Sequence, residues 1–193
     1  GSSRFPGKPL AKMLGLPMVL HVYERCCLSE SLDRVAIATC DEEIYQTCRD
    51  YGAQVVMTRA DHAGAVDRTA EAVNLIGGHL ADDDLVLMVQ GDEALVAPDM
   101  IAPIVTAFRE LDAPVVNLAS PIETESEHDN SNVVKIAAAP SGRALFFSRA
   151  PIPSRSRVAC SNLLQQTGVI GFSKAFLNTF LKLVHHFTNN LPF

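Results

Sequence analysis

The first ten residues, GSSRFPGKPL, contain the side chains best suited to binding an anion. Arg4 and Lys8 provide two cations within one short loop. Pro6 and Pro9 restrict the backbone, and Gly7 permits backbone angles that a β-carbon would exclude. A stiff loop that presents N–H groups beside two cations suits a polyphosphate. The loop matches neither G-x-x-x-x-G-K-S/T nor G-x-G-x-x-G, so a surface turn with two solvated cations is the alternative.

A second chemical signal is the carboxylate of Asp92, which closely follows the apolar run LVLMV in the segment LVLMVQGDE. A carboxylate at the tip of a rigid strand is well placed to hold a magnesium ion that bridges phosphate oxygens. Glycine followed by aspartate is also common in ordinary turns at strand ends, so a plain turn is the alternative.

Polar segments follow three predicted strands, at residues 40–43, 58–68 and 90–93. Ligands of open α/β sheets bind outside the carboxyl ends of the strands, so these segments form the predicted ligand edge. His62 is a candidate base or ligand, although a lone histidine is more often structural. Arg149 either grips an anionic substrate or pairs with a surface acid. The predicted ligand edge consists of Arg59, Asp61, His62, Asp67, Arg68, Gln90, Asp92 and Glu93.

The elements that position these residues alternate between helix and strand. Asp41 and Ser173 are candidate N-caps, Gly52 is a helix stop signal, and Pro103 predicts a kink. Helical periodicity predicts helices within 18–31, 41–52, 67–78, 98–111 and 173–186. Apolar runs predict strands at 34–39, 54–58, 84–90, 113–120 and 167–172.

Repeated strand–helix–strand units predict an α/β fold, a three-layer sandwich with a mostly parallel, Rossmann-like sheet. The continuous apolar run at 84–90 fits a strand that helices cover on both faces. From residue 120 the pattern changes, and the polar segment 121–132 is predicted to be a loop. Residues 133–139 and 143–149 are predicted strands of a hairpin joined through Pro-Ser-Gly. Because the opening loop precedes a helix, we expect it to follow a strand, and the sequence has none before it.

Composition excludes several functional classes for this chain of 193 residues. The net charge of −6 argues against a general binder of nucleic acid or anionic membranes. The five cysteines are an odd number without C-x-x-C spacing, which favours free thiols in a reducing cytoplasm over disulfides or a zinc site. No apolar run approaches the roughly 20 residues that span a bilayer. We therefore expect a cytoplasmic protein.

With these residues in view, the sequence resembles the 3-deoxy-manno-octulosonate cytidylyltransferases, the CMP-Kdo synthetase family. It is also similar to the relatives that use the 8-amino analogue. The resemblance runs from residue 1 to about residue 153, in the order of the family. The matching segments are GSSRFPGKPL, P-M-x-x-H-V-x-E-R at 17–25, TRADH with DR at 67–68, VQGDE, NVVKI and ALFFSRAPIP.

The resemblance implies a fold of the nucleotide-diphospho-sugar transferase type and a nucleotidyltransferase reaction. CTP and a 3-deoxy-2-ulosonic acid, Kdo or a close analogue, would give a CMP-sugar and pyrophosphate, with Mg2+ as cofactor. Such an enzyme would serve lipopolysaccharide biosynthesis. The resemblance further implies a homodimer, with the contact at the hairpin.

The resemblance also implies the roles of individual residues. Arg4 and Lys8 would bind the triphosphate, and Asp92 would hold magnesium; these three are the predicted catalytic residues. The predicted nucleotide-binding residues are Ser3, Gly7, Arg68 and Gln90, and the predicted sugar-binding residues are Arg149 and Gln166.

On this basis residues 1–193 form a single cytidylyltransferase domain, with 120–160 as a hairpin appendage. The family has a strand ending in I-P-A-R before the opening loop, and a C-terminal V-D-T-P-E-D segment that carries a second magnesium aspartate. We expect the chain to lack both.

Two motifs depart from the family and bear on the substrate. H-x-S-G-T-D/E-R is HAGAVDR here, which places Gly64 and Val66 where the family has hydroxyl residues. H-L-G-I-Y-G-Y is QTGVIGF, which places Gln166, Ile170 and Phe172 where it has a histidine and two tyrosines. Lost polar groups change how a sugar is held, so a different ulosonic acid is plausible. The alternatives are a cytidylyltransferase for a sialic-acid-like nonulosonate and a non-catalytic nucleotide-binding homologue.

Overall fold

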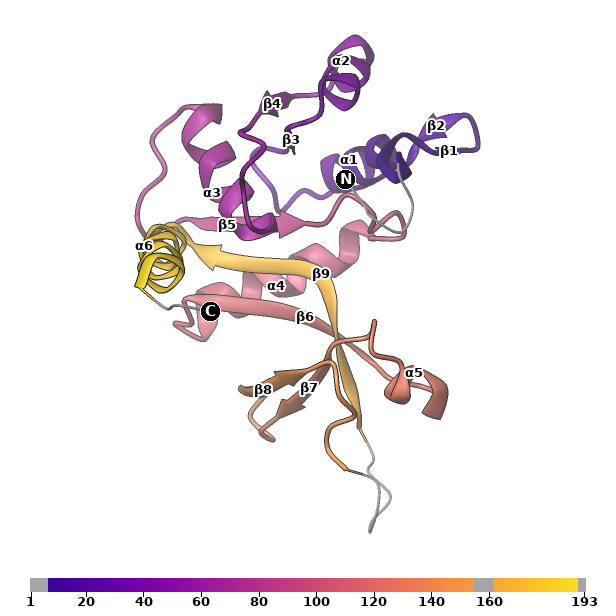
Figure 1. The fold of residues 1–193 in the computed structure, drawn as a ribbon, viewed down its shortest axis with the longest axis vertical. Helices are drawn as coiled ribbons and strands as arrows, with labels where there is room; N and C mark the ends of the chain where they lie inside the picture. The colour runs from indigo at the N-terminus through magenta and orange to yellow at the C-terminus, as the bar shows by residue number, and fades with distance from the viewer. Residues whose placement is uncertain (1–6, 155–161, 191–193) are drawn as a thin grey trace. The chain divides into compact units, whose positions relative to one another are not determined.

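The structure, a computed structural model, describes residues 7–154 and 162–190, and the side chains of α6 up to residue 182. The chain divides into two compact units (Figure 1). Unit 1 comprises the residues up to Val116 and those from Val169 onward, and unit 2 comprises Asn117–Gly168. We predicted a hairpin appendage at 120–160, which falls inside unit 2.

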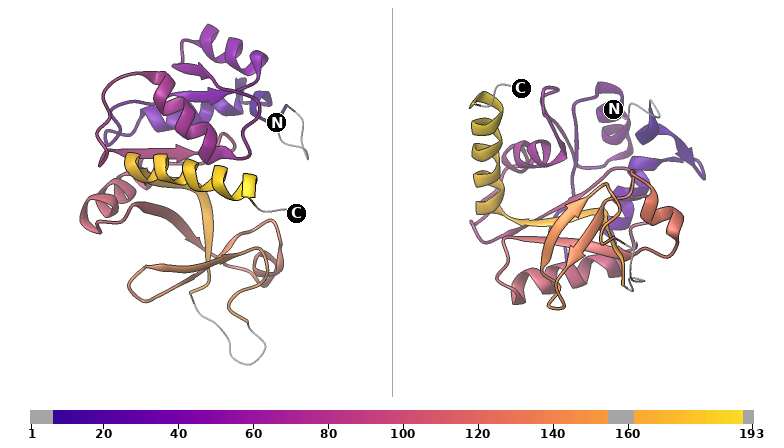
Figure 2. Two further views of the ribbon diagram at one scale, coloured as in Figure 1. Left: turned by 60° about the vertical axis from the view of Figure 1, so that its left-hand side comes forward. Right: turned by 60° about the horizontal axis from the view of Figure 1, so that its bottom comes forward.

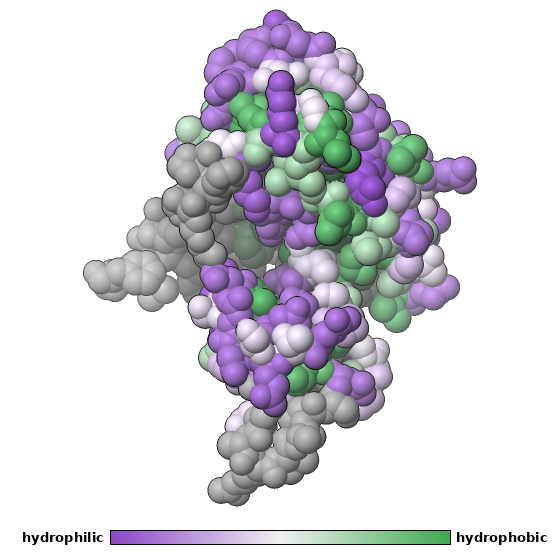
Figure 3. Space-filling model, turned by 90° about the vertical axis from the view of Figure 1, so that its right-hand side faces the viewer, coloured by the Kyte–Doolittle hydropathy of each residue, from purple (hydrophilic) through white to green (hydrophobic). Residues whose placement is uncertain are grey.

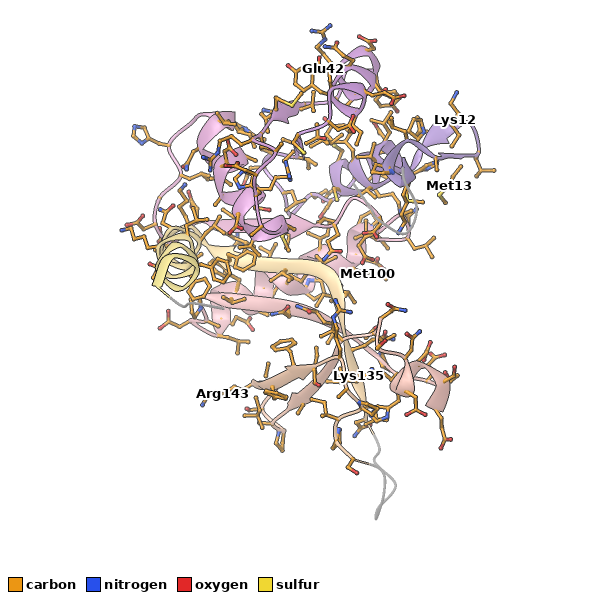
Figure 4. The ribbon with its side chains drawn as sticks, viewed as in Figure 1. Lys12, Met13, Glu42, Met100, Lys135 and Arg143 are labelled. Carbon is orange, nitrogen blue, oxygen red and sulfur yellow. The ribbon has the colours of Figure 1, made fainter. Side chains whose placement is uncertain are left out.

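Unit 1 opens with a turn-rich segment that leads into a helix. A short antiparallel pair, not predicted from the sequence, turns through Leu14 and Gly15, whose φ angles are 50° and 87°. Lys12 and Met13 project outward from this turn (Figure 4). The elements are η1 (Lys8–Leu10), β1 (Lys12–Met13), β2 (Leu16–Pro17) and α1 (Met18–Cys27).

The next elements confirm the predicted alternation of strand and helix. Asp41 caps its helix, because its carboxylate accepts hydrogen bonds from the backbone N–H groups of Glu43 and Ile44. Gly52 ends the same helix with a φ of 92°, a left-handed conformation that favours glycine. The elements are β3 (Ile37–Thr39), α2 (Glu42–Tyr51), β4 (Val55–Met57) and α3 (Ala65–Ile76).

The predicted helix around Pro103 forms as α4, which continues through the proline without a break. Pro98 occupies the first turn of α4 and Pro103 lies within it. Ser173 caps α6, because its hydroxyl accepts a hydrogen bond from the Phe176 N–H. The elements are β5 (Leu85–Val89), α4 (Pro98–Glu110) and α6 (Lys174–Asn190), and the strands β6 (Val115–Pro121) and β9 (Leu164–Ser173) each belong in part to unit 1 and in part to unit 2.

The prediction of a mostly parallel sheet is not confirmed. β3 and β4 pair in parallel, whereas β5 pairs antiparallel with β9, which also pairs with β6. The strands therefore form a mixed arrangement. The physical reason is that the chain returns from unit 2 along β9, in the direction opposite to β5.

Helices cover both sides of the strands of unit 1, which is the predicted α/β layering. α3 contacts α6 on one side, and α1 contacts α4 on the other (Figure 2). One buried cluster contains Val86 and Met88 of β5 with Phe172 and Leu177. These contacts make β5 a rigid support for the residues that follow it.

The described cysteines are free, in agreement with the sequence-based expectation; Cys160 lies outside the described residues. Burial raises the pKa of the Cys26 thiol to about 11, so this thiol stays protonated at neutral pH. Within the part of the chain that the structure describes, no helix has both the length and the apolar character needed to cross a membrane.

Unit 2 contains the predicted hairpin and one helix that the sequence analysis missed. β7 (Lys135–Ala138) and β8 (Ala144–Ser148) pair antiparallel, and Arg143 lies at the outer end of the hairpin (Figure 4). The segment at 121–132 was predicted to be loop-like, yet α5 (Glu125–Asp129) forms there. Its signal is a capping box, in which Thr124 and Glu127 bond each other's backbone N–H groups.

Lys135 is fully buried in unit 2, where its ammonium group joins three carbonyl oxygens (Figure 4). The Nζ atom donates to the carbonyls of Asn130, Val133 and Arg149 at 2.6, 3.0 and 2.9 Å. A buried charge is costly unless hydrogen bonds compensate for it, and these three bonds do so. Lys135 therefore fixes the backbone of Arg149 against the segment before β7.

Candidate functional site

The structure brings together two charged side chains that lie 84 positions apart in the sequence. The Nζ atom of Lys8 donates to Oδ2 of Asp92 at 2.7 Å. Both side chains keep contact with solvent, with exposed fractions of 32% and 43%. The pair is therefore accessible to a ligand that carries both negative charge and a metal ion.

Local backbone geometry explains how these two residues are presented. Gly7 has a φ of 73°, which favours glycine, and its carbonyl accepts the Leu10 N–H at 2.9 Å to close η1. After β5 ends, the Gln90 carbonyl accepts the Glu93 N–H at 3.0 Å. Asp92 thus sits in a turn at the tip of a packed strand. The position in a turn is compatible with a role as a magnesium ligand, so the two interpretations do not exclude each other.

A cavity of about 1270 Å³ within unit 1 contains this ion pair in its wall. Apolar side chains of α1, α3, β3 and β5 line most of it, and its polar lining residues lie both before and after the strands. The predicted site residues in its lining are Lys8, His62, Arg68, Gln90 and Asp92.

Two neighbouring strand edges face this cavity. Among the described residues, β3 pairs with β4 and β5 pairs with β9, so each has one partner. Ile37 and Ala38 of β3 and all residues from Leu85 to Val89 of β5 line the cavity. The unpaired edge of each strand offers backbone donors and acceptors.

Arg68 holds the loop between β4 and α3, a role that the sequence analysis did not predict. Its guanidinium group donates to the Thr58 hydroxyl and to the Arg59 carbonyl, the latter at 3.2 Å. The Gly64 N–H donates to the Asp67 carboxylate at 3.2 Å, which closes the first turn of α3. Arg68 therefore positions the loop and at the same time lines the cavity.

Glu71, which the sequence analysis missed, binds the same loop from α3. Its Oε2 atom accepts from the Arg59 N–H at 3.1 Å and contacts Nε2 of His62. The hydrogen bond with His62, followed by that from Arg59, holds the pKa of Glu71 below its usual value. The signal that could have revealed Glu71 is its spacing of three from Arg68, which places both side chains on one face of the helix.

The residues present fit a magnesium ion only in part. Among the side chains of residues 7–154 and 162–182, no three from histidine, cysteine, aspartate or glutamate gather as ligands. Magnesium, however, is usually held by one or two carboxylates, with phosphate oxygens and water as its other ligands. The half-exposed Asp92 carboxylate fits the protein's share of such a site.

The predicted sugar-binding residues belong to unit 2. The guanidinium group of Arg149 donates to the Ser131 carbonyl at 3.0 Å. The Gln166 amide donates to the Asn117 side chain at 2.7 Å. Ser3 and Arg4, predicted to bind the nucleotide, lie outside the described residues.

Comparison with known proteins identifies similar sequences over nearly the whole chain. The family model described as Cytidylyltransferase matches residues 1–190. The 3-deoxy-manno-octulosonate cytidylyltransferase of Syntrophobacter fumaroxidans is 43% identical over 185 residues, which cover 94% of this chain and 73% of that protein. The 8-amino-3,8-dideoxy-manno-octulosonate cytidylyltransferase of Shewanella amazonensis is 41% identical, over 95% of this chain and 75% of that protein.

A solved structure matches as well. CMP:2-keto-3-deoxy-manno-octonic acid synthetase complexed with CTP superimposes with a TM-score of 0.84 and 32% sequence identity. The match covers 95% of this chain and 74% of that structure's chain.

Proposed function

This chain belongs to the cytidylyltransferase family, and from that premise we propose that it transfers CMP from CTP to a 3-deoxy-2-ulosonic acid and releases pyrophosphate. The observation that carries the proposal is the pairing of Lys8 with Asp92 in the wall of a cavity large enough for a nucleotide. The CTP-bound relative and the similar enzymes named for two octulosonates support it.

The acid that we propose is 3-deoxy-manno-octulosonate or its 8-amino analogue, since the similar enzymes carry those names. The CMP-sugar would then enter lipopolysaccharide biosynthesis. A cytoplasmic setting fits the free thiols of the described cysteines, because disulfides are rare there.

In the proposed mechanism, the anomeric hydroxyl of the acid attacks the α-phosphorus of CTP. The new bond joins that oxygen to phosphorus as the hydroxyl proton passes to water, the bond to the bridging oxygen breaks, and pyrophosphate leaves with the electron pair. Such catalysis consists mainly of positioning and charge neutralisation. Lys8 would bind the leaving phosphates, and Gly7 would let the backbone of its loop approach them closely.

Asp92 would hold magnesium, which when bound neutralises phosphate charge and polarises the phosphoryl oxygens. With Asp92 in that role, Lys8 would donate from its ammonium group to phosphate instead of to the Asp92 carboxylate. Gln90 and Arg68 line the same cavity and would contact the nucleotide. Arg149 would pair with the sugar's carboxylate, and Gln166 would hydrogen-bond to its hydroxyl groups.

Turnover with a panel of acids tests the proposal. Pyrophosphate release with CTP and magnesium should be fastest with 3-deoxy-manno-octulosonate or its 8-amino analogue. Faster release with a nonulosonate would assign the chain to the sialic-acid-like alternative. No release with any acid, from the product of the complete reading frame, would favour a non-catalytic nucleotide-binding protein.

We also propose that residues 1–193 belong to one cytidylyltransferase domain in which an extended segment fills the gap between β3 and β5. An extended backbone satisfies the unpaired donors and acceptors of both edges, which apolar side chains alone cannot do. The N–H groups of Ile37 and Val86 point to β4 and β9, so those of Ala38 and Leu87 point to the gap. Amide hydrogen exchange at Ala38 and Leu87 in the product of the complete reading frame should then be slow. Fast exchange at both would contradict the proposal.

A homodimer through β8 is the oligomeric state that we propose. β8 pairs with β7 and exposes Leu145, Phe146 and Phe147, with exposed fractions of 63, 61 and 38%. An exposed apolar strand at a sheet edge favours association. Figure 3 shows another face of the molecule, where apolar residues are scattered among polar ones. Light scattering should give the dimer mass, and a monomer at all concentrations would contradict this.

A further inference from the structure

The segment between β4 and α3 forms part of the cavity wall, and α3 itself holds it in place. His62, Ala63 and Gly64 line the cavity, as does Arg68 of α3. Two turns of the helix reach back to this segment, one through Arg68 and the other through Glu71. The position of this wall therefore depends on side chains of α3 that bond to the segment.

The contact between Glu71 and His62 determines which ring nitrogen of His62 carries a hydrogen. The pKa of Glu71 is lowered, so its carboxylate is ionised at neutral pH and can only accept hydrogen bonds. His62 must therefore donate through Nε2, so this ring nitrogen carries a hydrogen. The His62 side chain is only 6% exposed, so its ring is held between the segment and the helix.

This attachment matters more here because the wall lacks hydroxyl side chains. Gly64 and Val66 occupy the positions at which the resembled family has hydroxyl residues. Ala63 and Gly64 of this wall carry no polar side chain, so they can hydrogen-bond to a ligand only through backbone groups, whose position depends on what anchors the segment. Backbone groups misplaced by about 1 Å lose much of their value in binding and catalysis.

We infer that His62 and Glu71 are positioning residues for the nucleotide: together they anchor residues 61–64 on α3, so that this segment forms a fixed wall of the CTP site. The inference rests on the proposed function.

The test measures CTP binding by calorimetry and steady-state kinetics on the complete protein. Glu71→Ala and His62→Ala should each raise the KM and Kd for CTP by about 10-fold, the usual effect of losing a hydrogen bond to a charged group. The kcat should stay within about 3-fold, because neither side chain touches the reacting atoms. Glu71→Gln keeps an acceptor oxygen and should recover most of the affinity.

A double variant distinguishes an anchoring pair from two independent residues. His62→Ala combined with Glu71→Ala should raise the Kd little more than either change alone, because both remove the same anchor. Glu42→Ala is the matched control, since Glu42 on α2 bonds Gln46 of its own helix and does not line the cavity. It should leave the Kd unchanged.

The outcomes separate the inference from the function on which it rests. Wild-type protein that binds no CTP would overturn the proposed function itself. Wild-type binding with unchanged Kd in folded variants, or a loss confined to kcat, would overturn the positioning role. Should Glu71→Ala not fold, His62→Ala carries the test, because it leaves the bond between Glu71 and the Arg59 N–H intact.

Discussion

Replacing Asp92 with asparagine should lower the kcat for CMP-sugar formation by about 100- to 1000-fold, the range seen when one group that stabilises transition-state charge is removed. The carboxamide keeps the shape of the side chain but carries no charge to hold magnesium. Asp92 is 43% exposed, and its pairing with Lys8 contributes little to folding. The loss should therefore appear in kcat at an unchanged melting temperature. Pyrophosphate release under saturating CTP and acid measures it.

Asp112→Asn is the matched control for this variant. Asp112 is exposed, does not line the cavity and has a φ of 46°, which asparagine tolerates well. The same change of charge there should leave kcat within about 2-fold, as expected for a surface substitution. Equal losses of kcat in both variants would mean that the change in overall charge causes the Asp92 effect. Full activity of Asp92→Asn would mean that the Asp92 carboxylate has no part in the mechanism.

Replacing Lys8 with glutamine should lower kcat/KM for CTP by about 100-fold, because a charge-assisted contact to the leaving phosphates is lost. Lys8→Arg keeps the charge but changes its geometry, so it should recover part of the activity. The ion pair with Asp92 is exposed to solvent, so the stability of Lys8→Gln should differ little from that of the wild type.

Lys12→Gln provides the control for Lys8. Lys12 lies four positions further along the chain and projects from the β1–β2 turn, outside the cavity lining (Figure 4). The substitution removes the same charge and should leave kcat/KM unchanged. A comparable loss in Lys12→Gln would mean that general attraction of CTP, and not a contact at Lys8, accounts for the effect.

Local features of the fold could be predicted because the residues that cause them are adjacent in sequence. The helix ends predicted from residue type are found in the structure: Asp41 and Ser173 cap helix N-termini, and Gly52 ends α2. The helix α5 was missed although Thr124 and Glu127 carry its capping signal, because a polar segment of that length was interpreted as a loop. The antiparallel pairing of β9 with β5 follows from the chain's return path, which no local pattern encodes.

For the candidate site as well, residues with a local sequence signal could be predicted, and contacts that depend on packing could not. The rule that ligands bind beyond the carboxyl ends of strands led to Asp92, and the stiff cationic loop led to Lys8. The contacts of Glu71 with His62 and Arg59 depend on how α3 is rotated over the loop, which the sequence does not specify. Arg68 was predicted to touch the nucleotide, and its bonds to the loop appear only in three dimensions.

Calorimetry of CTP binding with and without magnesium tests the central claim most directly. If Lys8 and Asp92 together hold a metal-bound nucleoside triphosphate, magnesium should tighten CTP binding to the wild type by about 10-fold or more and have little effect on Asp92→Asn. Lys8→Gln should bind more weakly yet keep its response to magnesium. An equal response to magnesium in the wild type and Asp92→Asn would contradict the account.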